Sequence, residues 1–170
     1  MSASLPIDLL KRYRDGYEIF FETGTSEGDT VQTAIECGFR KIYSVELDQS
    51  VFDKVRRRFI ASDRVSLMRG SSVEALATMI PSLDLPTIFF LDAHPDVDQG
   101  VSPVLEELDE ISKVQVDFLI FIDDMNYMGM GMWTSRESIF SRLDNMDMKY
   151  SIIPNDRRSD ALLIAWRQDE

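Results

Sequence analysis

Two apolar runs that end directly in acidic residues constrain the fold of this chain more than any other feature. Residues 87–91 lead into Asp92, and residues 118–122 lead into Asp123 and Asp124. A short unbroken apolar run is typical of a central strand that is buried on both faces of a parallel sheet. Because segments of helical periodicity separate such runs, we predict an α/β fold with a doubly wound, mostly parallel sheet and helices on both faces.

The remaining elements follow the same alternation. We predict strands at residues 18–22, 41–46, 65–69, 87–92, 118–124, 148–153 and 161–166. We predict helices at residues 6–15, 27–37, 49–60 and 71–80, one that begins at Ser102 and Pro103, and one capped by Thr134 and Glu137. The last two strands are joined through residues 154–156, which is compatible with an antiparallel hairpin.

Length and charge limit the class of protein. The chain has 170 residues, 44% hydrophobic and 28% charged, which fits a single domain over residues 1–170. Its net charge of -12 would repel a phosphate backbone, so we expect no nucleic-acid partner and read the basic cluster at residues 54–58 as a solvated helix face. No segment reaches the roughly 18 apolar residues of a membrane span and residues 1–6 lack a signal pattern, so we expect a cytoplasmic protein without a membrane partner.

Residues 19–30 predict a ligand-binding turn between a strand and a helix. The apolar residues end in Glu22, and Gly24 and Gly28 follow before the helical pattern begins. Glycines allow a positive φ and a close approach of the backbone to a ligand, and the N–H groups at a helix start carry partial positive charge. The stretch is not a dinucleotide fingerprint, because Ser26 stands at the middle glycine position and the third glycine is missing.

Acidic residues gather at one edge of the predicted sheet. Glu22, Glu46, Asp92, Asp123 and Asp124 lie at strand ends, and ligands of such sheets bind beyond the carboxyl ends of the strands. Glu46 is placed to accept hydrogen bonds from both hydroxyls of a ribose. An acid at Glu22, near the charged centre of a cofactor, suits a cation better than a pyrophosphate. S-adenosylmethionine, with its sulfonium and ammonium groups, meets both requirements.

These motifs together resemble a class I S-adenosylmethionine-dependent methyltransferase over residues 18–166. They are the turn at residues 22–28, Glu46 after the second strand, and residues 69–71, 91–94 and 122–124. The closer likeness is to the metal-dependent O-methyltransferases, which include the catechol type and the macrocin type that acts on sugar hydroxyls. The resemblance implies a seven-stranded sheet whose last strand is antiparallel.

The resemblance also implies how the cofactor is held. Residues 24–26 would lie along its methionine moiety, Glu46 would hold the ribose, and Ser71 or Ser72 would border the adenine. The full set of cofactor-binding candidates is Glu22, Gly24, Thr25, Ser26, Gly28, Thr30, Glu46, Gly70, Ser71, Ser72 and Asp92.

A metal site is implied as well, because in that group a carboxylate after the fourth strand and an acidic pair after the fifth hold one Mg²⁺. These positions correspond to Asp92, Asp123 and Asp124. Mg²⁺ prefers oxygen ligands, and a substrate with adjacent hydroxyls that replaces two of its waters becomes more acidic. His94, the single histidine, is the candidate general base beside Asp92, since an unperturbed pKa of about 6.5 suits proton acceptance near neutrality. A loop-packing role for His94 is the alternative, and Asp96 is a possible substitute base.

Three functions stay open at this level. The first is a Mg²⁺-dependent O-methyltransferase that acts on a small hydroxylated molecule such as a sugar, a catechol or a natural product. The second is a metal-independent methyltransferase, and the third is a catalytically silent cofactor-binding domain with a role in assembly or regulation. Loops at residues 95–102 and 125–133, the second with Tyr127 and Trp133, are the expected cover of the pocket, and a homodimer would help to close it.

Overall fold

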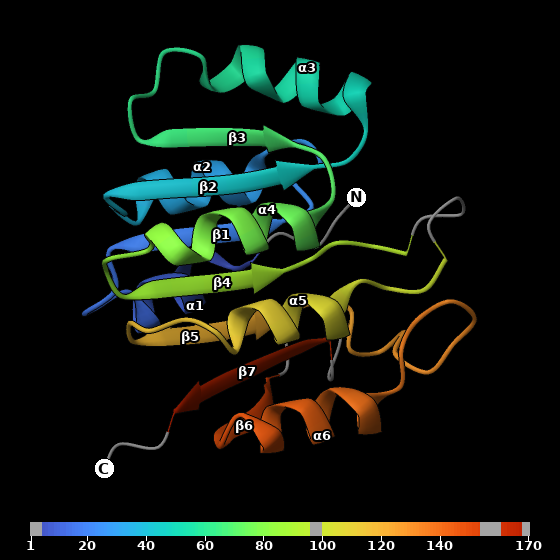
Figure 1. Cartoon of the computed structure of the whole chain (residues 1–170). Helices are drawn as coiled ribbons and strands as arrows, with labels where there is room; N and C mark the ends of the chain where they lie inside the picture. The colour runs from blue at the N-terminus through green and yellow to red at the C-terminus, as the bar shows by residue number, and fades with distance from the viewer. Residues whose placement is uncertain (1–4, 96–99, 154–160, 168–170) are drawn as a thin grey trace.

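The computed structural model of the chain describes residues 5–95, 100–153 and 161–167. A seven-stranded sheet crosses it in the order β3-β2-β1-β4-β5-β7-β6 (Figure 1). β1 to β5 are parallel to their neighbours, and β7 is antiparallel to both β5 and β6. The strands are β1 (Ile19–Thr23), β2 (Lys41–Glu46), β3 (Val65–Arg69), β4 (Thr87–Leu91), β5 (Phe118–Ile122), β6 (Met148–Ile153) and β7 (Leu162–Arg167). The predicted doubly wound sheet, its antiparallel last strand and the antiparallel pairing of the last two strands are confirmed. The predicted connection at residues 154–156 lies outside the described residues.

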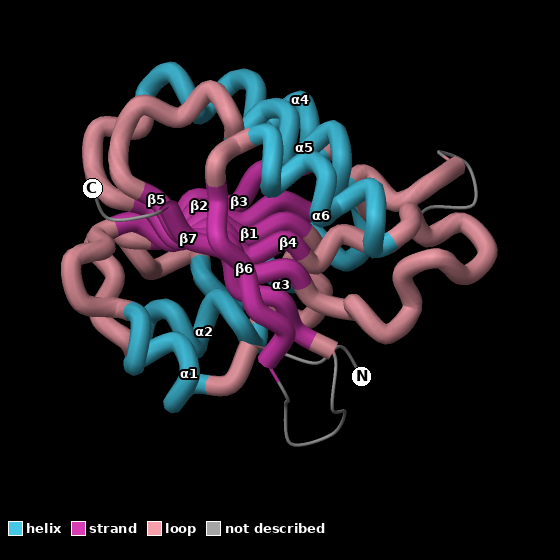
Figure 2. The backbone as a smooth tube through the Cα atoms, turned by 90° about the horizontal axis from the view of Figure 1, so that it is seen from below, coloured by secondary structure: helices cyan, strands magenta, loops and turns pink. Residues whose placement is uncertain are grey.

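Helices cover both faces of this sheet, as Figure 2 shows from below. They are α1 (Ile7–Tyr13), α2 (Asp29–Glu36), α3 (Gln49–Phe59), α4 (Ser72–Met79), α5 (Val104–Ile111) and α6 (Arg136–Asn145), and a 3₁₀ turn (Ile80–Ser82) follows α4. Buried residues of α4, α5 and α6 belong to one core cluster, and those of α1, α2 and α3 belong to another. The sheet therefore separates two hydrophobic layers.

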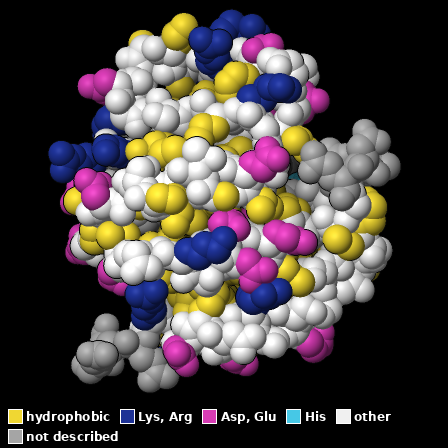
Figure 3. All heavy atoms as spheres, in the orientation of Figure 1, with side chains coloured by type: hydrophobic (Ala, Val, Ile, Leu, Met, Phe, Trp, Pro, Cys, Tyr) yellow, Lys and Arg dark blue, Asp and Glu magenta, His cyan; other side chains and the backbone are white. Residues whose placement is uncertain are grey.

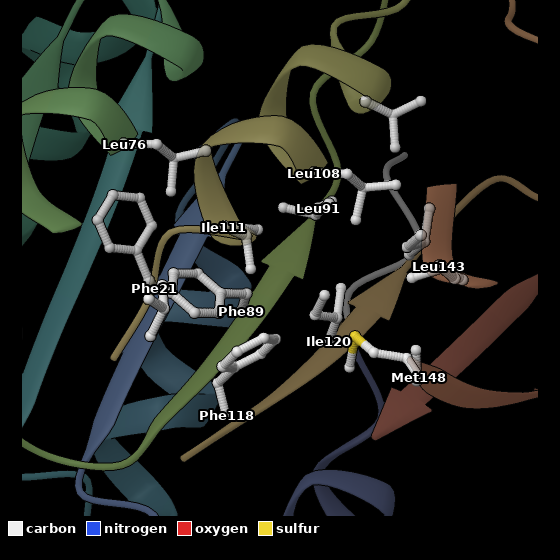
Figure 4. Packing of buried hydrophobic residues seen from close by; sticks show 14 of the residues in the cluster. Phe21, Leu76, Phe89, Leu91, Leu108, Ile111, Phe118, Ile120, Leu143 and Met148 are labelled. Carbon is white, nitrogen blue, oxygen red and sulfur yellow. The ribbon is translucent and has the colours of Figure 1, made fainter. Parts of the chain in front are cut away.

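The central strands are buried along their whole length because both of their faces are covered. Their side chains alternate between the two layers with the period of two expected for a strand. Phe21, Phe89 and Phe118 pack together beneath α5 (Figure 4), whereas Phe20 and Phe90 face the opposite layer. The unbroken apolar runs of the sequence thus fill two cores at once.

The register of the central strands brings their carboxyl ends level with one another. Thr23 pairs with Leu91, and Leu91 pairs with Ile122. The residues that follow β4 and β5 consequently leave the sheet side by side, which places Asp92 next to Asp123 and its neighbours. This edge of the sheet is where the candidate site is built.

Several predicted boundaries were wrong by one or two residues. β1 continues through Thr23, so Glu22 lies inside the strand and is fully buried, whereas we expected it at the strand end. The N-cap of α6 is Ser135, whose hydroxyl accepts from the N–H of Ser138, rather than Thr134. α5 begins after Pro103, one residue later than predicted. Such differences arise because local sequence marks a helix start only to within a residue or two.

Basic side chains are concentrated on α3, at the top of the face seen in Figure 3. Lys54, Arg56, Arg57 and Arg58 are exposed, while Val55 between them is buried. The expectation that this cluster is a solvated helix face is confirmed. Within the described parts of the chain, no helix combines the length and the apolar character needed to cross a membrane.

Candidate functional site

The turn between β1 and α2, residues 24–28, is called the glycine loop below. Its first two N–H groups, those of Gly24 and Thr25, both donate to the carbonyl of Val45 at 3.0 Å, which anchors the loop on β2. Gly24 has a φ of +84°, and a Cβ at this position would lie 2.5 Å from the carbonyl oxygen of Asp92. Only glycine fits such a close approach of two backbone segments.

Ser26 adopts a backbone conformation that is uncommon for residues other than glycine. Its φ is 48°, in the left-handed region, and its N–H donates to Glu46 Oε2 at 2.9 Å. The other oxygen of Glu46 accepts from the N–H of Asp48 at 2.9 Å. Glu46 therefore clamps the glycine loop to the start of α3, and each of its oxygens retains a lone pair for a ligand hydroxyl. Serine in place of a middle glycine therefore does not prevent the loop from being held against β2 and α3.

A buried polar network lies beneath the loop. Ser44 donates to Glu22 Oε2 at 2.6 Å and also hydrogen-bonds to Thr25 Oγ1 at 2.6 Å, and the Thr30 side chain bonds to the same carboxyl group. Burial raises the pKa of Glu22 to about 8, against which the Ser44 hydrogen bond acts. Glu22 is consequently neutral near pH 7 and supports the loop from inside.

An open cavity of about 510 Å³ lies in front of the loop and is called the cofactor cavity below. Of the predicted cofactor-binding residues, those that line it are Gly24, Ser26, Glu46, Gly70, Ser71, Ser72 and Asp92. Those that do not line it are Glu22, Thr25, Gly28 and Thr30. Gly28 has a packing role, because a Cβ there would lie 2.7 Å from the Phe59 ring of α3. Lining residues that the sequence reasoning missed are Val45, Leu47, Asp48, Gln49 and Val51, at the end of β2 and the start of α3.

A second group of residues, Asp92, His94 and Asp124, adjoins the cavity and is called the charged cluster below. His94 Nε2 lies 2.9 Å from Asp124 Oδ2 and 3.7 Å from Asp92 Oδ1. Asp124 follows β5 with a φ of 58°, a left-handed conformation that Asp tolerates better than most residues. Asp123, the third predicted metal ligand, turns one carboxylate oxygen to the N–H of Asp124 at 2.8 Å. The structure thus gathers His94 where we expected Asp123.

Hydrogen bonds and burial shift the pKa values of His94 and Asp92 in this cluster. Hydrogen bonds to Asp124 and then to Asp92 raise the pKa of His94 to about 10, although partial burial acts against this. Burial raises the pKa of Asp92 to about 6, while its contact with His94 lowers it. At neutral pH His94 is an imidazolium held between carboxylates, and in this state it has no free lone pair with which to act as a general base.

The donor set of the charged cluster fits a divalent cation. One ligand atom from each of Asp92, His94 and Asp124 lies within 4.8 Å of the other two. The carboxylates suit Mg²⁺ or Mn²⁺, whereas the imidazole nitrogen suits Fe²⁺ or Zn²⁺. The set is therefore less selective for Mg²⁺ than the three aspartates expected from the sequence.

Aromatic rings extend outwards from the cluster along the loop after β5. The Trp133 ring meets His94 edge-on at 5.5 Å between centroids and stacks on Tyr127 at 5.8 Å. Tyr127, Met130 and Met132 are exposed large apolar side chains of this loop. A lid movement of this loop stays a prediction.

No protein-family model and no curated protein sequence matches the chain. Solved structures match nearly all of it. An O-methyltransferase from Bacillus cereus in complex with SAH gives a TM-score of 0.72 at 13% identity over 95% of this chain and 78% of that one. TomG, an O-methyltransferase from Streptomyces achromogenes involved in tomaymycin synthesis, in complex with SAM, gives 0.65 at 14% identity over 96% and 78%. The 23S rRNA methyltransferase ErmE gives 0.61 at 14% identity over 96% and 68%. These similarities establish that the chain has the fold of class I methyltransferases.

Proposed function

We propose that the protein is an S-adenosylmethionine-dependent methyltransferase that acts on a hydroxyl group of a small molecule. The main support is that the cofactor cavity and the charged cluster lie side by side at one edge of the sheet. The cofactor cavity, whose wall contains the hydrogen bond between Ser26 and Glu46, adjoins the charged cluster. Ligands of doubly wound sheets bind at this edge, and methyl transfer requires donor and acceptor to meet there.

The cavity offers each part of the cofactor a suitable neighbour. Glu46 retains acceptor capacity for the ribose hydroxyls, and Ser71 and Ser72, at the start of α4, border the space assigned to the adenine. Gly24 and Ser26 line the part of the cavity that we assign to the methionine end of the cofactor. S-adenosylmethionine bound here would supply an electrophilic methyl group to an oxygen that approaches from the side of Asp92.

The acceptor hydroxyl must lose a proton as its oxygen takes the methyl group. A divalent cation held by Asp92 and Asp124, together with His94, would make a coordinated hydroxyl more acidic. The pKa of His94 is high because of the two carboxylates. His94 could take the acceptor proton only if Asp92 and Asp124 alone held the cation, because the cation would then offset their charge and leave the imidazole neutral and uncoordinated.

A metal-independent methyltransferase is the second candidate, and the ion pair itself favours it. The imidazolium of His94 already bridges Asp92 and Asp124, which is the place a cation would take. In that case the three residues position the acceptor through hydrogen bonds, a carboxylate of the cluster accepts its proton, and proximity supplies most of the rate.

The negative net charge of the chain favours a small-molecule acceptor over a nucleic acid. Although one similar structure is an rRNA methyltransferase, the present chain has a formal net charge of -12. Binding to a phosphate backbone depends on a basic surface, and the exposed basic cluster here belongs to α3. Sugars, catechols and hydroxylated natural products are the acceptor classes we propose to screen.

The test is transfer of a labelled methyl group to a panel of such acceptors, with and without EDTA. We expect turnover that EDTA abolishes and that Mg²⁺ or Mn²⁺ restores, with Asp124→Asn inactive. The exposed Asp84, which precedes β4 at the opposite end of the sheet, provides Asp84→Asn as a control with full activity. Turnover that is insensitive to EDTA would favour the metal-independent mechanism. Cofactor binding without turnover on any acceptor would contradict the proposal that the protein is an enzyme.

A further inference from the structure

A small, partly open hollow of about 10 Å³ lies between α5 and the charged cluster. Its lining includes Asp92, His94 and Asp124, and also Ser102 and Glu107. Ser102 and Glu107 are 2% and 1% exposed, so both are withdrawn from solvent. The hollow is distinct from the much larger cofactor cavity.

Two residues that line this hollow each have a buried polar atom without a hydrogen-bond partner. In the described part of the chain, three buried side-chain atoms are unsatisfied, and two of them are Ser102 Oγ and Glu107 Oε1. A buried polar atom without a partner is costly, and two such atoms around one space indicate a ligand that bonds to both.

The opposite side of the Glu107 carboxyl group is fully engaged. The side chains of Ser72 and Thr23 hydrogen-bond to it, which lowers its pKa against the larger raising effect of burial. The Thr23 hydroxyl in turn accepts from the N–H of Asp92 at 3.3 Å. Glu107 thereby connects Ser72, in the wall of the cofactor cavity, with the backbone of Asp92.

We propose that one water molecule occupies the hollow, bonded to Ser102 Oγ and Glu107 Oε1, and that Glu107 is a positioning residue for the cofactor cavity. Fixed by this water on one side, its carboxyl group holds the start of α4 and the end of β4 at a set separation. The role in cofactor binding rests on the proposed function, whereas the water site does not.

Size and chemistry favour water over a metal ion. A hollow of this volume holds about one water molecule, and water needs two to four polar partners. A cation bound at Ser102 Oγ and Glu107 Oε1 would need about four further ligands. The carboxylates of Asp92 and Asp124 are instead paired with His94. Water also both donates and accepts, so it satisfies Glu107 Oε1 whether the carboxyl group is ionised or protonated. The pKa of Glu107, raised to about 7 by burial, makes both states accessible near neutrality.

The position of Glu107 in the sequence offers a signal that our sequence reasoning did not use. Val104, Glu107, Leu108 and Ile111 are spaced as one helical face, and all four are buried. An acid on the apolar stripe of a helix is rarely buried without a specific partner.

A crystal structure at about 1.5 Å resolution tests the water directly. We expect a density peak within hydrogen-bond distance of both Ser102 Oγ and Glu107 Oε1. An empty hollow between well-ordered side chains, or a peak with the short distances and ligand number of a cation, would overturn the water site.

The positioning role is tested with variants and S-adenosylhomocysteine. Glu107→Gln keeps an acceptor for Ser72 and Thr23, so its dissociation constant should stay within about threefold of the wild type. Glu107→Leu leaves both hydroxyls without an acceptor and should weaken binding at least tenfold. Glu106→Leu, at the exposed neighbouring acid, is the matched control and should bind normally.

Each outcome is decisive. Normal binding by a folded Glu107→Leu, or equal loss in Glu107→Gln and Glu107→Leu, would overturn the positioning role. If Glu107→Leu does not fold, Thr23→Val removes the same connection from the side of Asp92, and unchanged binding there would overturn it equally. Failure of the wild type to bind S-adenosylhomocysteine would instead refute the proposed function, and the crystallographic peak would still decide the water site.

Discussion

The two halves of the site edge are held in shape by different forces. The glycine loop is fixed by backbone hydrogen bonds to Val45, by the Glu46 carboxylate and by the neutral Glu22 beneath it. The charged cluster is held by an ion pair between His94 and two aspartates, with His94 itself 56% exposed at its side chain. Hydrogen bonds and close packing at Gly24 therefore determine the shape of the glycine loop, whereas attraction between opposite charges holds the charged cluster together. Substitutions of shape should damage the loop, and salt and metals should act mainly on the cluster, whereas pH should act on both halves, through Glu22 and through His94.

The largest effect is expected for Gly24→Ala. A Cβ there would meet the Asp92 carbonyl at 2.5 Å, so backbone must shift in a residue whose φ is already +84°. We expect a loss of about 3 kcal/mol in the free energy of unfolding and no measurable cofactor binding. Gly38→Ala is the matched control, because φ is +80° and nothing lies within 4 Å of its Cβ. It should lose only about 1 kcal/mol, and equal losses in urea unfolding would show that sterics do not govern the loop.

Glu22 should make stability depend on pH. Its pKa of about 8 in the folded state exceeds the ordinary value of 4.5, so the native protein binds one more proton than the unfolded chain between these values. The free energy of unfolding therefore falls as pH rises through this window, by about 1.4 kcal/mol per pH unit for one proton. Urea unfolding at pH 6 and pH 7.5 should show this fall, and Glu22→Gln should reduce its slope. An unchanged slope in Glu22→Gln would mean that Glu22 is ionised in the native state.

His94 provides a direct reading of the charged cluster, because it is the single histidine in the chain. We expect its NMR titration to have a midpoint about 10, and Asp124→Asn to move the midpoint down towards 6.5, since Asp124 is the largest cause of the rise. The ion pair stabilises the fold below pH 6.5, and this contribution is lost as pH rises through the folded pKa. Because His94 is partly exposed, we expect a cost in stability of about 1 kcal/mol at most. A wild-type midpoint near 6.5 would show that His94 does not form this ion pair in solution.

The smallest effect is expected for Ser26→Gly. Relief of the left-handed conformation at a φ of 48° and the greater freedom of glycine in the unfolded chain act in opposite directions. We expect a change in the free energy of unfolding within about 1 kcal/mol and cofactor affinity within a few fold of the wild type. A large loss of affinity would show that the Ser26 side chain itself contacts the cofactor.

The sequence predicts the shared frame of both halves well. Apolar runs such as residues 87–91 and 118–122 mark buried strands, and their order places Asp92 and Asp124 on one edge of the sheet. Glu46 was correctly placed at the end of β2, because strand direction and the ribose argument agree on that position. These features depend on periodicity and connectivity, which local sequence carries.

The protonation and direction of individual side chains could not be predicted in the same way. Glu22 is neutral because its burial is complete, and Asp123 accepts a hydrogen bond from the N–H of Asp124, which adopts a left-handed conformation. His94 is an imidazolium because two carboxylates converge on it. Each outcome depends on distances across the sheet edge that no local pattern encodes. The homodimer and the cytoplasmic location stay predictions.

The most direct measurement is calorimetric titration of the folded protein with S-adenosylhomocysteine, which has both ends of the cofactor and lacks its methyl group. We predict saturable one-to-one binding by the wild type and by Gly38→Ala, and none by Gly24→Ala. Absence of binding to folded wild-type protein, or equal binding by Gly24→Ala, would contradict the assignment of the cavity to the methyl donor.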